Sequence, residues 1–501
     1  MTLIDQVERD NIIKDEGNVV VSASAGSGKT TIMIKKIKNT LEDITDHKTI
    51  AAITFTNKAA EEIGKKAKDE GVTKEFVSMT NDAFIEHEII RPFITDTYDL
   101  FLENDFTIDY NYKFRSFDNG LQAISEHSKL GVYKDIKRNF KFELAYDILK
   151  KNIVAREYIQ AKYKMIFLDE YQDTDLDMHT LFMFLKDQLN ITLFIVGDAK
   201  QAIYLWRGAQ SNIFEMLKQD DMNHYSLIKN FRCHDEIVNY ANLIHNSRYF
   251  NNDYTVPVSR LVHCKTDDFI SSFTRMVENN IINIQEEITI IINVNNDARR
   301  CADKLNNAGY NFLFIPKTPI DDNTPNSYLL RQLACYIIDS NYSIYNFIEN
   351  INVDSRKQTV NRIEEIIWKL KGEVNSEEFE TTLLEFGDLL EIEFTANELS
   401  LLFKTVQDKG YHSAFIKSDD MHKVMTVFSS KGLEFKQVIS FSKYYNDFEN
   451  TSQNHYVSIT RAEEKFIMVL SGSKYEDYIN QQSKNHGVLD SKYLFKRVNH
   501  I

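Results

Sequence analysis

The sequence is poor in proline, glycine and cysteine, with 5 Pro, 16 Gly and 4 Cys among 501 residues. So few Pro and Gly exclude long linkers and low-complexity segments. The cysteines are widely spaced and form no CxxC pair, which excludes a disulfide framework and a zinc site of paired cysteines. They indicate incidental or buried thiols in a reducing compartment. They are Cys233, Cys264, Cys301 and Cys335.

Long hydrophobic runs are also missing. The longest, such as Ile288–Val294, are far shorter than a membrane span. The first residues, MTLIDQVERD, lack the basic and apolar regions of a signal peptide. We therefore expect a cytoplasmic protein with no membrane partner. The length exceeds that of one domain, and 43% hydrophobic residues suffice for ordinary globular cores.

Basic residues are outnumbered, with 59 Lys and Arg against 74 Asp and Glu and a net charge of −15. This balance weighs mildly against a nucleic-acid binder, because phosphate contacts need Lys and Arg. A locally basic groove can nevertheless work on an acidic protein.

The stretch Val19–Thr31 predicts a phosphate-binding loop, since three valines lead into small residues, then Lys29 and a helical segment over Ile32–Ile37. Glycines let backbone N–H groups curl around an anion, and the helix N-terminus adds positive charge. Lys29 can reach the β- and γ-phosphates of ATP, and Thr30 can ligate Mg²⁺. The strict pattern has Gly at the first position, so the motif alone leaves open a small-residue turn. The expected loop residues are Ala23, Ser24, Ala25, Gly26, Ser27, Gly28, Lys29, Thr30 and Thr31.

Two further strands end in polar groups. The strand over Lys164–Leu168 leads into Asp169 and Glu170, the arrangement expected for a Mg²⁺ ligand and a base that takes a proton from the attacking water. The alternative is an exposed acidic turn. The strand over Leu193–Val196 leads towards Gln201, which can sense a γ-phosphate.

Candidate nucleic-acid contacts lie in two loops. Thr56 and Asn57 follow the strand over Ile50–Phe55, where simple helix capping is the alternative. Tyr204 and Trp206, with Arg207 beside them, suit base stacking next to a cation, whereas a core Trp is the alternative.

Three more polar residues are weak candidates when each is taken alone. Gln6 can pair with an adenine edge. Arg232 can reach a nucleotide, and Arg461, expected at the start of a helix, can act as an arginine finger. For each, a solvated surface residue is the alternative.

The remaining pattern is α/β with helical insertions. Aromatic residues crowd the segment 86–160, and 335–415 reads as helical. The segment 373–398 holds nine acidic residues and no Lys or Arg, so it suits internal packing or a protein partner better than DNA.

Taken in order, the motifs resemble those of UvrD/Rep/PcrA-like superfamily 1 DNA helicases. They run from residue 23 to 462, and Ala23 is normal for that family. They read ASAGSGKT, TFTNKAA, LDEYQDT, GDAKQAIYLWRGA, LIKNFR, TVFSSKGLEF and YVSITRA. Within this family the runs YKMIFLDEYQD and FIPKTPIDDNTPN and the reduced second insertion resemble the helicase subunits of Gabija antiphage systems.

The resemblance implies two RecA-like P-loop NTPase domains, parallel sheets with flanking helices, each with a helical insertion. The expected boundaries are 1–90 with 155–245 for the first domain, 91–154 for its insertion, 246–338 with 416–501 for the second, and 339–415 for a short acidic insertion. ATP with Mg²⁺ would bind in the cleft between them.

The residue roles that the family implies match positions of this sequence. The first domain supplies Lys29, Thr30, Asp169, Glu170 and Gln201, with Thr30 and Asp169 at the metal. Arg232 and Arg461 close on the γ-phosphate, Glu434 touches the ribose and Gln6 reads adenine. Single-stranded DNA lies against Phe55, Thr56, Asn57, Tyr204, Trp206 and Arg207.

The implied activity is DNA-dependent ATP hydrolysis with 3′-to-5′ translocation or unwinding. The implied partner is an OLD-family (ATPase/TOPRIM) nuclease in a hetero-oligomer. Phe428 stands where the family has a DNA-contacting His, Thr80–Phe84 replaces a Thr-x-His-Ser-type motif, and the second insertion is short. These departures keep open a DNA-end sensor or nucleotide-hydrolysing subunit with little unwinding. An ATP-binding scaffold is disfavoured by the intact motifs.

Overall fold

The computed structural model describes residues 5–100, 106–205, 208–321, 326–351, 357–372, 374–390, 392–416 and 422–499, without the side chains of 57, 58, 110, 111, 349 and 499. These residues form two compact units. The first comprises 1–23, 28–228 and 319–409, and the second comprises 24–27, 229–318 and 410–501. Within the described ranges no helix is long and apolar enough to cross a bilayer.

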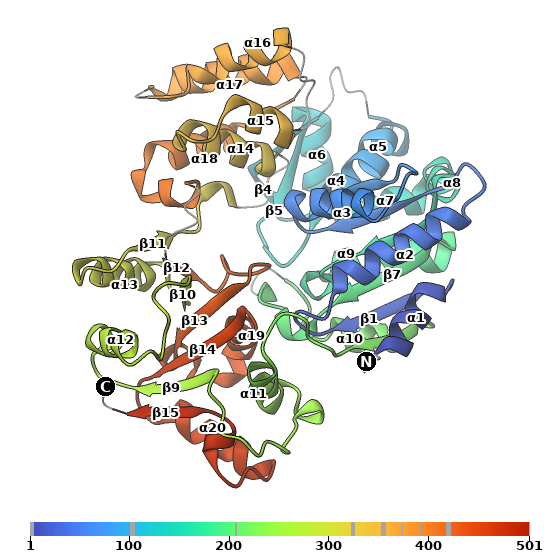
Figure 1. Ribbon diagram of the computed structural model, residues 1–501. Helices are drawn as coiled ribbons and strands as arrows, with labels where there is room; N and C mark the ends of the chain where they lie inside the picture. The colour runs from blue at the N-terminus through green and yellow to red at the C-terminus, as the bar shows by residue number, and fades with distance from the viewer. Residues whose placement is uncertain are drawn as a thin grey trace. The chain divides into compact units, whose positions relative to one another are not determined.

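The first unit is built on a parallel six-stranded sheet in the order β3-β2-β6-β7-β1-β8 (Figure 1). Its central strands are short apolar runs buried on both faces, as expected for a parallel sheet covered by helices. The strands are β1 (Val19–Ala23), β2 (Thr49–Thr54), β3 (Val77–Thr80), β6 (Tyr163–Leu168), β7 (Thr192–Gly197) and β8 (Asn223–Leu227).

Two apolar cores cover the faces of this sheet. In β1, Val19 and Val21 pack into one core and Val20 into the other, because alternate strand residues face opposite sides. The first core contains residues of α1 (Gln6–Lys14), α2 (Lys29–Asp43) and α3 (Asn57–Asp69). The second contains residues of α9 (Leu176–Leu189) and α10 (Ile213–Leu217).

The segment between β3 and β6 forms the first insertion. Its described residues form α4 (Asn81–Ile85), the π-helical turn η1 (Glu86–Ile90), α5 (Arg91–Tyr98), α6 (Phe117–His127), α7 (Phe140–Lys151) and α8 (Ile153–Lys162). The structure adds a two-stranded parallel sheet of β4 (Thr107–Phe114) and β5 (Lys129–Tyr133), which the helical interpretation of this segment did not contain. Gly131 allows the strands to approach, because a Cβ there would lie 2.2 Å from the Tyr112 carbonyl oxygen.

A second helical segment also groups with the first unit. It contains α14 (Ser327–Ile338), α15 (Ile344–Ile351), α16 (Lys357–Trp368), α17 (Ser376–Leu390) and α18 (Ala396–Gln407). Tyr328 of α14 shares a hydrogen bond with Glu61 of α3. Phe379, Leu383 and Phe386 of the acidic helix α17 are fully buried. Internal packing therefore accounts for the apolar face of that helix.

The second unit contains a seven-stranded parallel sheet in the order β11-β12-β10-β13-β14-β9-β15. Figure 1 shows β9, β14 and β13 as neighbouring arrows. The strands are β9 (Leu261–Lys265), β10 (Ile288–Ile292), β11 (Phe312–Ile315), β12 (His422–Thr426), β13 (Phe435–Phe441), β14 (Ala462–Leu470) and β15 (Lys496–Asn499). The helices are α11 (Asp235–His245), α12 (Phe269–Glu278), α13 (Asn295–Asn307), α19 (Phe448–Ile459) and α20 (Lys474–Asn485).

Short 3₁₀ turns complete the described elements. They are η2 (Tyr171–Asp173), η3 (Ala199–Gln201), η5 (Ser247–Tyr249), η6 (Pro319–Asp321), η7 (Lys409–Ala414), η8 (Ser442–Tyr445) and η9 (Ser491–Tyr493). Two parallel sheets flanked by helices confirm the predicted α/β class with RecA-like architecture.

Candidate nucleotide-binding site

The loop after β1 has the backbone of an anion cradle. Gly26 and Gly28 have φ of +66° and +81°, in the left-handed region that favours glycine. Gly28 is the N-cap of α2, and it supplies no side chain to cap the first N–H groups of the helix. Lys29 is the first residue of that helix. The arrangement offers backbone N–H groups and a helix N-terminus to an anion.

Strand order brings three polar strand ends to one edge of the first sheet. β7 lies between β6 and β1, and all three are parallel. Lys29 follows β1, Asp169 follows β6 and Asp198 follows β7 at the carboxyl ends of the strands. Ligands of open α/β sheets bind outside this edge.

Asp169 is nearly buried, with 7% of its surface exposed. Its backbone N–H donates to the Ile53 carbonyl at 2.9 Å, and its Oδ1 accepts from the Glu170 N–H at 2.8 Å. Glu170 has φ of +54°, which is strained for a residue with a Cβ. The turn thus fixes both carboxylates, and strain of this kind is concentrated at functional sites.

A chain of hydrogen bonds links Glu170 to Gln201. The Gln172 Nε2 donates to Glu170 Oε2, and the Gln172 Oε1 accepts from the Asp198 N–H at 2.9 Å. Gln201 Nε2 then donates to Asp198 Oδ2 at 2.8 Å. Gly197 makes room for Gln172, since a Cβ at Gly197 would lie 2.4 Å from the Gln172 Oε1. The candidate base and the candidate γ-phosphate sensor therefore belong to one network.

The oxygen atoms of Thr30 and Asp169 suit a Mg²⁺ ion that also binds phosphate oxygens. Within the described ranges no cluster of three His, Cys, Asp or Glu residues could hold a metal alone. Mg²⁺ bound with a nucleotide needs only one or two protein oxygens besides phosphate and water. Asp169 at the strand end and Thr30 in the first turn of α2 supply oxygens of that kind.

In the second unit, Arg232 and Arg461 both donate to backbone carbonyls of the segment 433–460. Arg232 Nε pairs with Glu434 Oε2 at 2.6 Å, and its Nη1 lies 3.5 Å from the Thr460 carbonyl. Arg461 is 1% exposed, and it donates to the carbonyls of Leu433 at 3.0 Å and Val457 at 3.3 Å. Arg461 does not start a helix: it follows α19 and immediately precedes β14, because an apolar strand continues the chain.

Gln6 lies at the first turn of α1. Its Nε2 donates to Asp10 Oδ1 at 2.8 Å. The helix is anchored by Arg9, whose Nε lies 2.8 Å from Asp5 Oδ1, and Asp5 Oδ2 accepts from the Ile228 N–H at 3.0 Å. The N-terminal helix is thus tied to the end of β8.

The described DNA candidates are Phe55, Thr56 and Tyr204. Phe55 and Tyr204 are half-buried. Thr56 is the N-cap of α3 and accepts from the Ala59 N–H at 3.2 Å, as the capping alternative predicts. The side chain of Asn57 and all of Trp206 and Arg207 lie outside the described residues.

Four residues of the predicted motifs had been given no role, and the structure shows them hydrogen-bonded to site residues. Gln172 and Asp198 form the network above, and Asn230 and Tyr456 hydrogen-bond to the loop residue Ala25. The amide and phenol types offered a signal, since each can serve donors and acceptors at once. All four cysteines are free thiols, of which Cys233 and Cys264 are buried, and burial raises the pKa of Cys233 to about 11.

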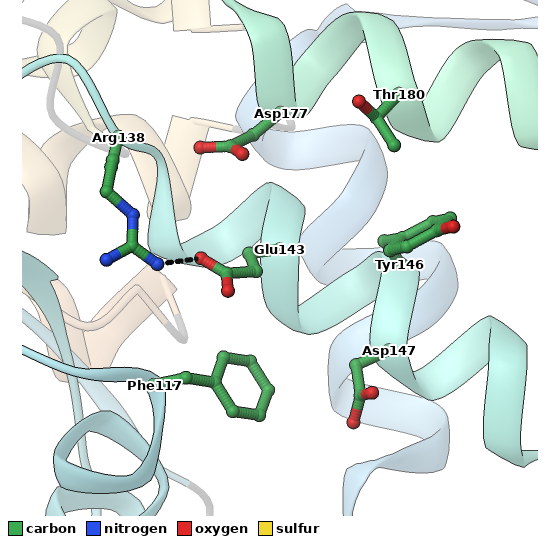
Figure 2. Close-up of a pocket in the computed structure, with 7 residues that line it drawn as sticks. All are labelled: Phe117, Arg138, Glu143, Tyr146, Asp147, Asp177 and Thr180. Carbon is green, nitrogen blue, oxygen red and sulfur yellow. Dashed lines mark hydrogen bonds and ion pairs between the residues drawn. The ribbon is translucent and has the colours of Figure 1, made fainter.

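A separate pocket of about 350 Å³ lies in the first unit, and none of the predicted site residues lines it. Figure 2 shows Arg138 paired with Glu143 beside the carboxylates of Asp177 and Asp147. Burial raises the pKa of Asp177. Three of the seven lining residues are acidic and one is basic, so the pocket is unsuited to a phosphate. Phe117, Tyr146 and Thr180 complete it.

The sequence is similar to a known family and to known proteins. A family model described as an AAA domain matches residues 9–207. The Gabija protein GajB of Bacillus cereus (strain VD045) is 42% identical over 98% of this chain and 100% of its own length. The ATP-dependent DNA helicase Rep of Buchnera aphidicola is 31% identical over 50% of this chain and 44% of its own length. PcrA of Staphylococcus epidermidis is 29% identical over 46% and 38%.

The Rep and PcrA matches span less than half of those longer proteins, whereas the GajB match spans both chains. The P-loop geometry, the acidic pair and the two parallel sheets agree with these relationships. The chain belongs to the GajB family of UvrD-like superfamily 1 helicases.

Proposed function

We propose that this protein is a DNA-dependent ATPase and a 3′-to-5′ single-strand DNA translocase or helicase, acting in antiphage defence as the helicase subunit of a Gabija-type complex. The observation that carries the proposal is the shared edge of the first sheet. There Lys29 follows a glycine cradle, and Glu170 and Gln201 belong to one hydrogen-bonded network.

ATP would bind through the loop 23–31, between β1 and the first turn of α2. Mg²⁺, held by Thr30 and Asp169, would neutralise phosphate charge. Lys29 Nζ would neutralise charge on the β- and γ-phosphates. Glu170 would accept a proton from water at its carboxylate, whose orientation the Gln172 amide fixes.

The second unit would supply cations and base contacts. Arg232 and Arg461 would stabilise charge on the γ-phosphate, and Glu434 would contact the ribose. Arg232 is ion-paired with Glu434 in this structure, so phosphate binding would exchange one anionic partner for another. Gln6 of the first unit would read the adenine edge.

Single-stranded DNA would lie against Phe55, Thr56, Asn57, Tyr204, Trp206 and Arg207. Aromatic side chains give stacking surfaces that tolerate any base, and Arg207 adds a cation. The polarity is supported by the likeness to UvrD-like helicases in motif order.

The proposed protein partner is an OLD-family (ATPase/TOPRIM) nuclease, GajA, in a hetero-oligomer. The identity with GajB over the whole chain supports a Gabija-type partner.

A second candidate function is a DNA-end sensor or nucleotide-hydrolysing subunit with little autonomous unwinding. The helical segment 319–409 favours it: this segment is short, and its acidic helix α17 buries its apolar face within the protein. Such a segment offers little positive charge for engaging duplex DNA.

ATP turnover of the purified chain, with and without single-stranded DNA, tests the proposal, with Lys29→Ala as the blank. We expect strong stimulation by DNA. Strand displacement on a tailed duplex then separates a motor from a sensor. A folded protein that binds ATP but shows no stimulation contradicts DNA-dependent hydrolysis by the chain alone.

A further inference from the structure

A closed ring of hydrogen bonds holds the apex of the phosphate-binding loop within the second unit, which includes residues 24–27. On one side, Asn230 Nδ2 donates to the Ala25 carbonyl at 2.8 Å. On the other side, the Ala25 N–H donates to the Tyr456 hydroxyl at 3.2 Å. Ala25 is 1% exposed, so both of its backbone groups are occupied by protein partners in a buried position.

The ring closes through the segments that carry the two arginines. Asn230 Oδ1 accepts from the N–H groups of Arg232 at 2.7 Å and Cys233 at 2.8 Å. The Cys233 thiol lies 3.6 Å from the Thr460 carbonyl, and the Thr460 N–H donates to the Tyr456 carbonyl at 3.0 Å. Arg461 is the next residue along the chain. The path from Ala25 through Asn230, Cys233, Thr460 and Tyr456 returns to Ala25.

Close packing reinforces one side of the ring. The Phe231 N–H donates to the Gly26 carbonyl at 2.8 Å. A Cβ on Gly26 would lie 2.7 Å from Asn230 Oδ1 and 2.8 Å from the Arg232 Cβ. The loop apex and the 230–232 segment therefore touch with no room for a side chain, and one cannot shift without the other.

We propose that Asn230 and Tyr456 are positioning residues for nucleotide hydrolysis, which register the phosphate-binding loop against the segments bearing Arg232 and Arg461. The proposal rests on the proposed ATPase function. Asn230 donates to the carbonyl of Ala25 and the Tyr456 hydroxyl accepts from its N–H, so both residues hold one residue of the loop. Since the ring closes on itself, opening it at either point releases the same constraint.

The test is a double-mutant cycle on ATP turnover with Asn230→Ala, Tyr456→Phe and the double variant. Each single change removes neutral hydrogen bonds to Ala25, so we expect the KM for ATP to rise about three- to tenfold. Because the ring is already open in each single variant, the double variant should be no worse than Asn230→Ala. Coupling of this kind is the signature of contact through a shared partner.

Matched controls separate positioning from general stability. Asn239 is also a side chain clamped to backbone, with 2.8 Å and 2.7 Å bonds to Asn251, but it lies in α11. Asn239→Ala should lower the melting temperature and leave the KM unchanged. Tyr444→Phe, which removes a hydroxyl bonded to Asp297, is the control for Tyr456→Phe.

Hydrogen exchange of a peptide containing Ala25, measured without nucleotide, gives a readout that does not depend on turnover. The ring predicts slow exchange in the unchanged protein and faster exchange in Asn230→Ala and Tyr456→Phe, but not in Asn239→Ala. An unchanged KM in both single variants, or strictly additive effects, would overturn the proposal. If the unchanged protein hydrolyses no ATP, the proposed function fails and the positioning role with it, while exchange still reports whether the ring exists.

Discussion

The two units share an architecture but present different chemistry. Each contains a parallel sheet with helices beside it. In the first, polar groups at the strand ends are acids, amides and a lysine: Asp169, Glu170, Gln201 and Lys29. In the second, the candidate site groups are Arg232 and Arg461, held by backbone carbonyls and Glu434. The candidate groups of the first unit are suited to binding phosphate and moving a proton, whereas those of the second unit are positively charged.

The second unit also contains a hydrogen-bonded network of histidines and tyrosines. His263 Nε2 lies 3.0 Å from the Tyr240 hydroxyl, which lies 2.7 Å from the Tyr475 hydroxyl. Tyr475 continues to His455 at 2.8 Å, and His455 to His245 at 2.9 Å. Burial lowers the pKa of His263 to about 3, with Arg497 adding to the shift, and lowers that of His455. Protonation of these two histidines therefore opposes folding of the second unit at low pH.

The substitution with the largest expected effect lies in the first unit. Lys29→Ala removes the cation at the start of α2, and we expect ATP turnover to fall to the blank level, at least about a thousandfold. A coupled-enzyme assay with single-stranded DNA measures it. Lys35→Ala is the matched control, because Lys35 is an exposed lysine on the same helix. Turnover that survives in Lys29→Ala contradicts the phosphate-binding role of the loop.

The next effect tests the second unit. Arg461→Ala should lower kcat about a thousandfold if its guanidinium stabilises transition-state charge. Single-turnover hydrolysis measures the chemical step directly.

Arg461 is buried, so Arg461→Ala can also destabilise the fold. Arg461→Lys keeps the charge and loses the fork, and it should recover only part of the rate. Arg300→Ala, an exposed arginine of α13, is the control. Equal rates for Arg461→Lys, Arg461→Ala and the unchanged protein would assign Arg461 a purely structural role.

A smaller effect separates binding from chemistry in the first unit. Glu170→Gln keeps an oxygen that can accept from Gln172 but removes the base, so kcat should fall about a hundredfold while ATP binding persists. Fluorescent-nucleotide binding and turnover are measured on the same preparation. Glu215→Gln, an exposed glutamate, is the control. Loss of nucleotide binding along with turnover would argue that Glu170 is structural.

Local motifs predicted the first unit better than the second. The strand, loop and helix around Lys29 are contiguous in sequence, so periodicity and small residues indicate them directly. The strand before Asp169 was recognised for the same reason. Arg461 was misplaced at a helix start because Thr460 is a favoured N-cap residue and Ala462 a strong helix former, although a strand begins at Ala462.

Long-range contacts could not be predicted from the sequence. Asn230 and Tyr456 meet Ala25 across about 200 and 430 positions, and no periodicity reports such pairs. The two-stranded sheet of β4 and β5 was missed because the aromatic residues of this segment were assigned to a helical subdomain, although aromatic residues are enriched in strands. The packing of residues 319–409 with the first unit depends on contacts such as that of Glu61 with Tyr328, which have no local signature.

The two tryptophans allow a predicted DNA contact to be compared with an exposed surface residue. Trp206→Ala should weaken single-strand binding by about 1–3 kcal/mol, the usual value for one base stacked on an aromatic ring. Fluorescence anisotropy of a labelled oligonucleotide measures it. Trp368→Ala is the control, since Trp368 lies at the end of α16 with 65% of its surface exposed. Unchanged affinity in Trp206→Ala would remove this residue from the DNA-binding loop.

The smallest expected effect concerns acid. A histidine whose folded pKa lies below its unfolded value of about 6.5 takes up a proton more readily when unfolded, so stability falls as pH decreases below about 6.5. For His263 the loss is about 1.4 kcal/mol per pH unit and continues down to its folded pKa of about 3. Urea denaturation at about pH 7.5 and pH 5.5 measures the slope.

His263→Gln sharpens this prediction. A glutamine amide can replace the hydrogen bond to Tyr240 but does not titrate, so the variant should lose less stability between the two pH values even if it is less stable at both. His224→Gln, an exposed position on β8 of the first unit, should leave the slope unchanged. If His263→Gln keeps the full slope, the acid sensitivity comes from other groups, and His455, whose pKa burial also lowers, is the next to replace.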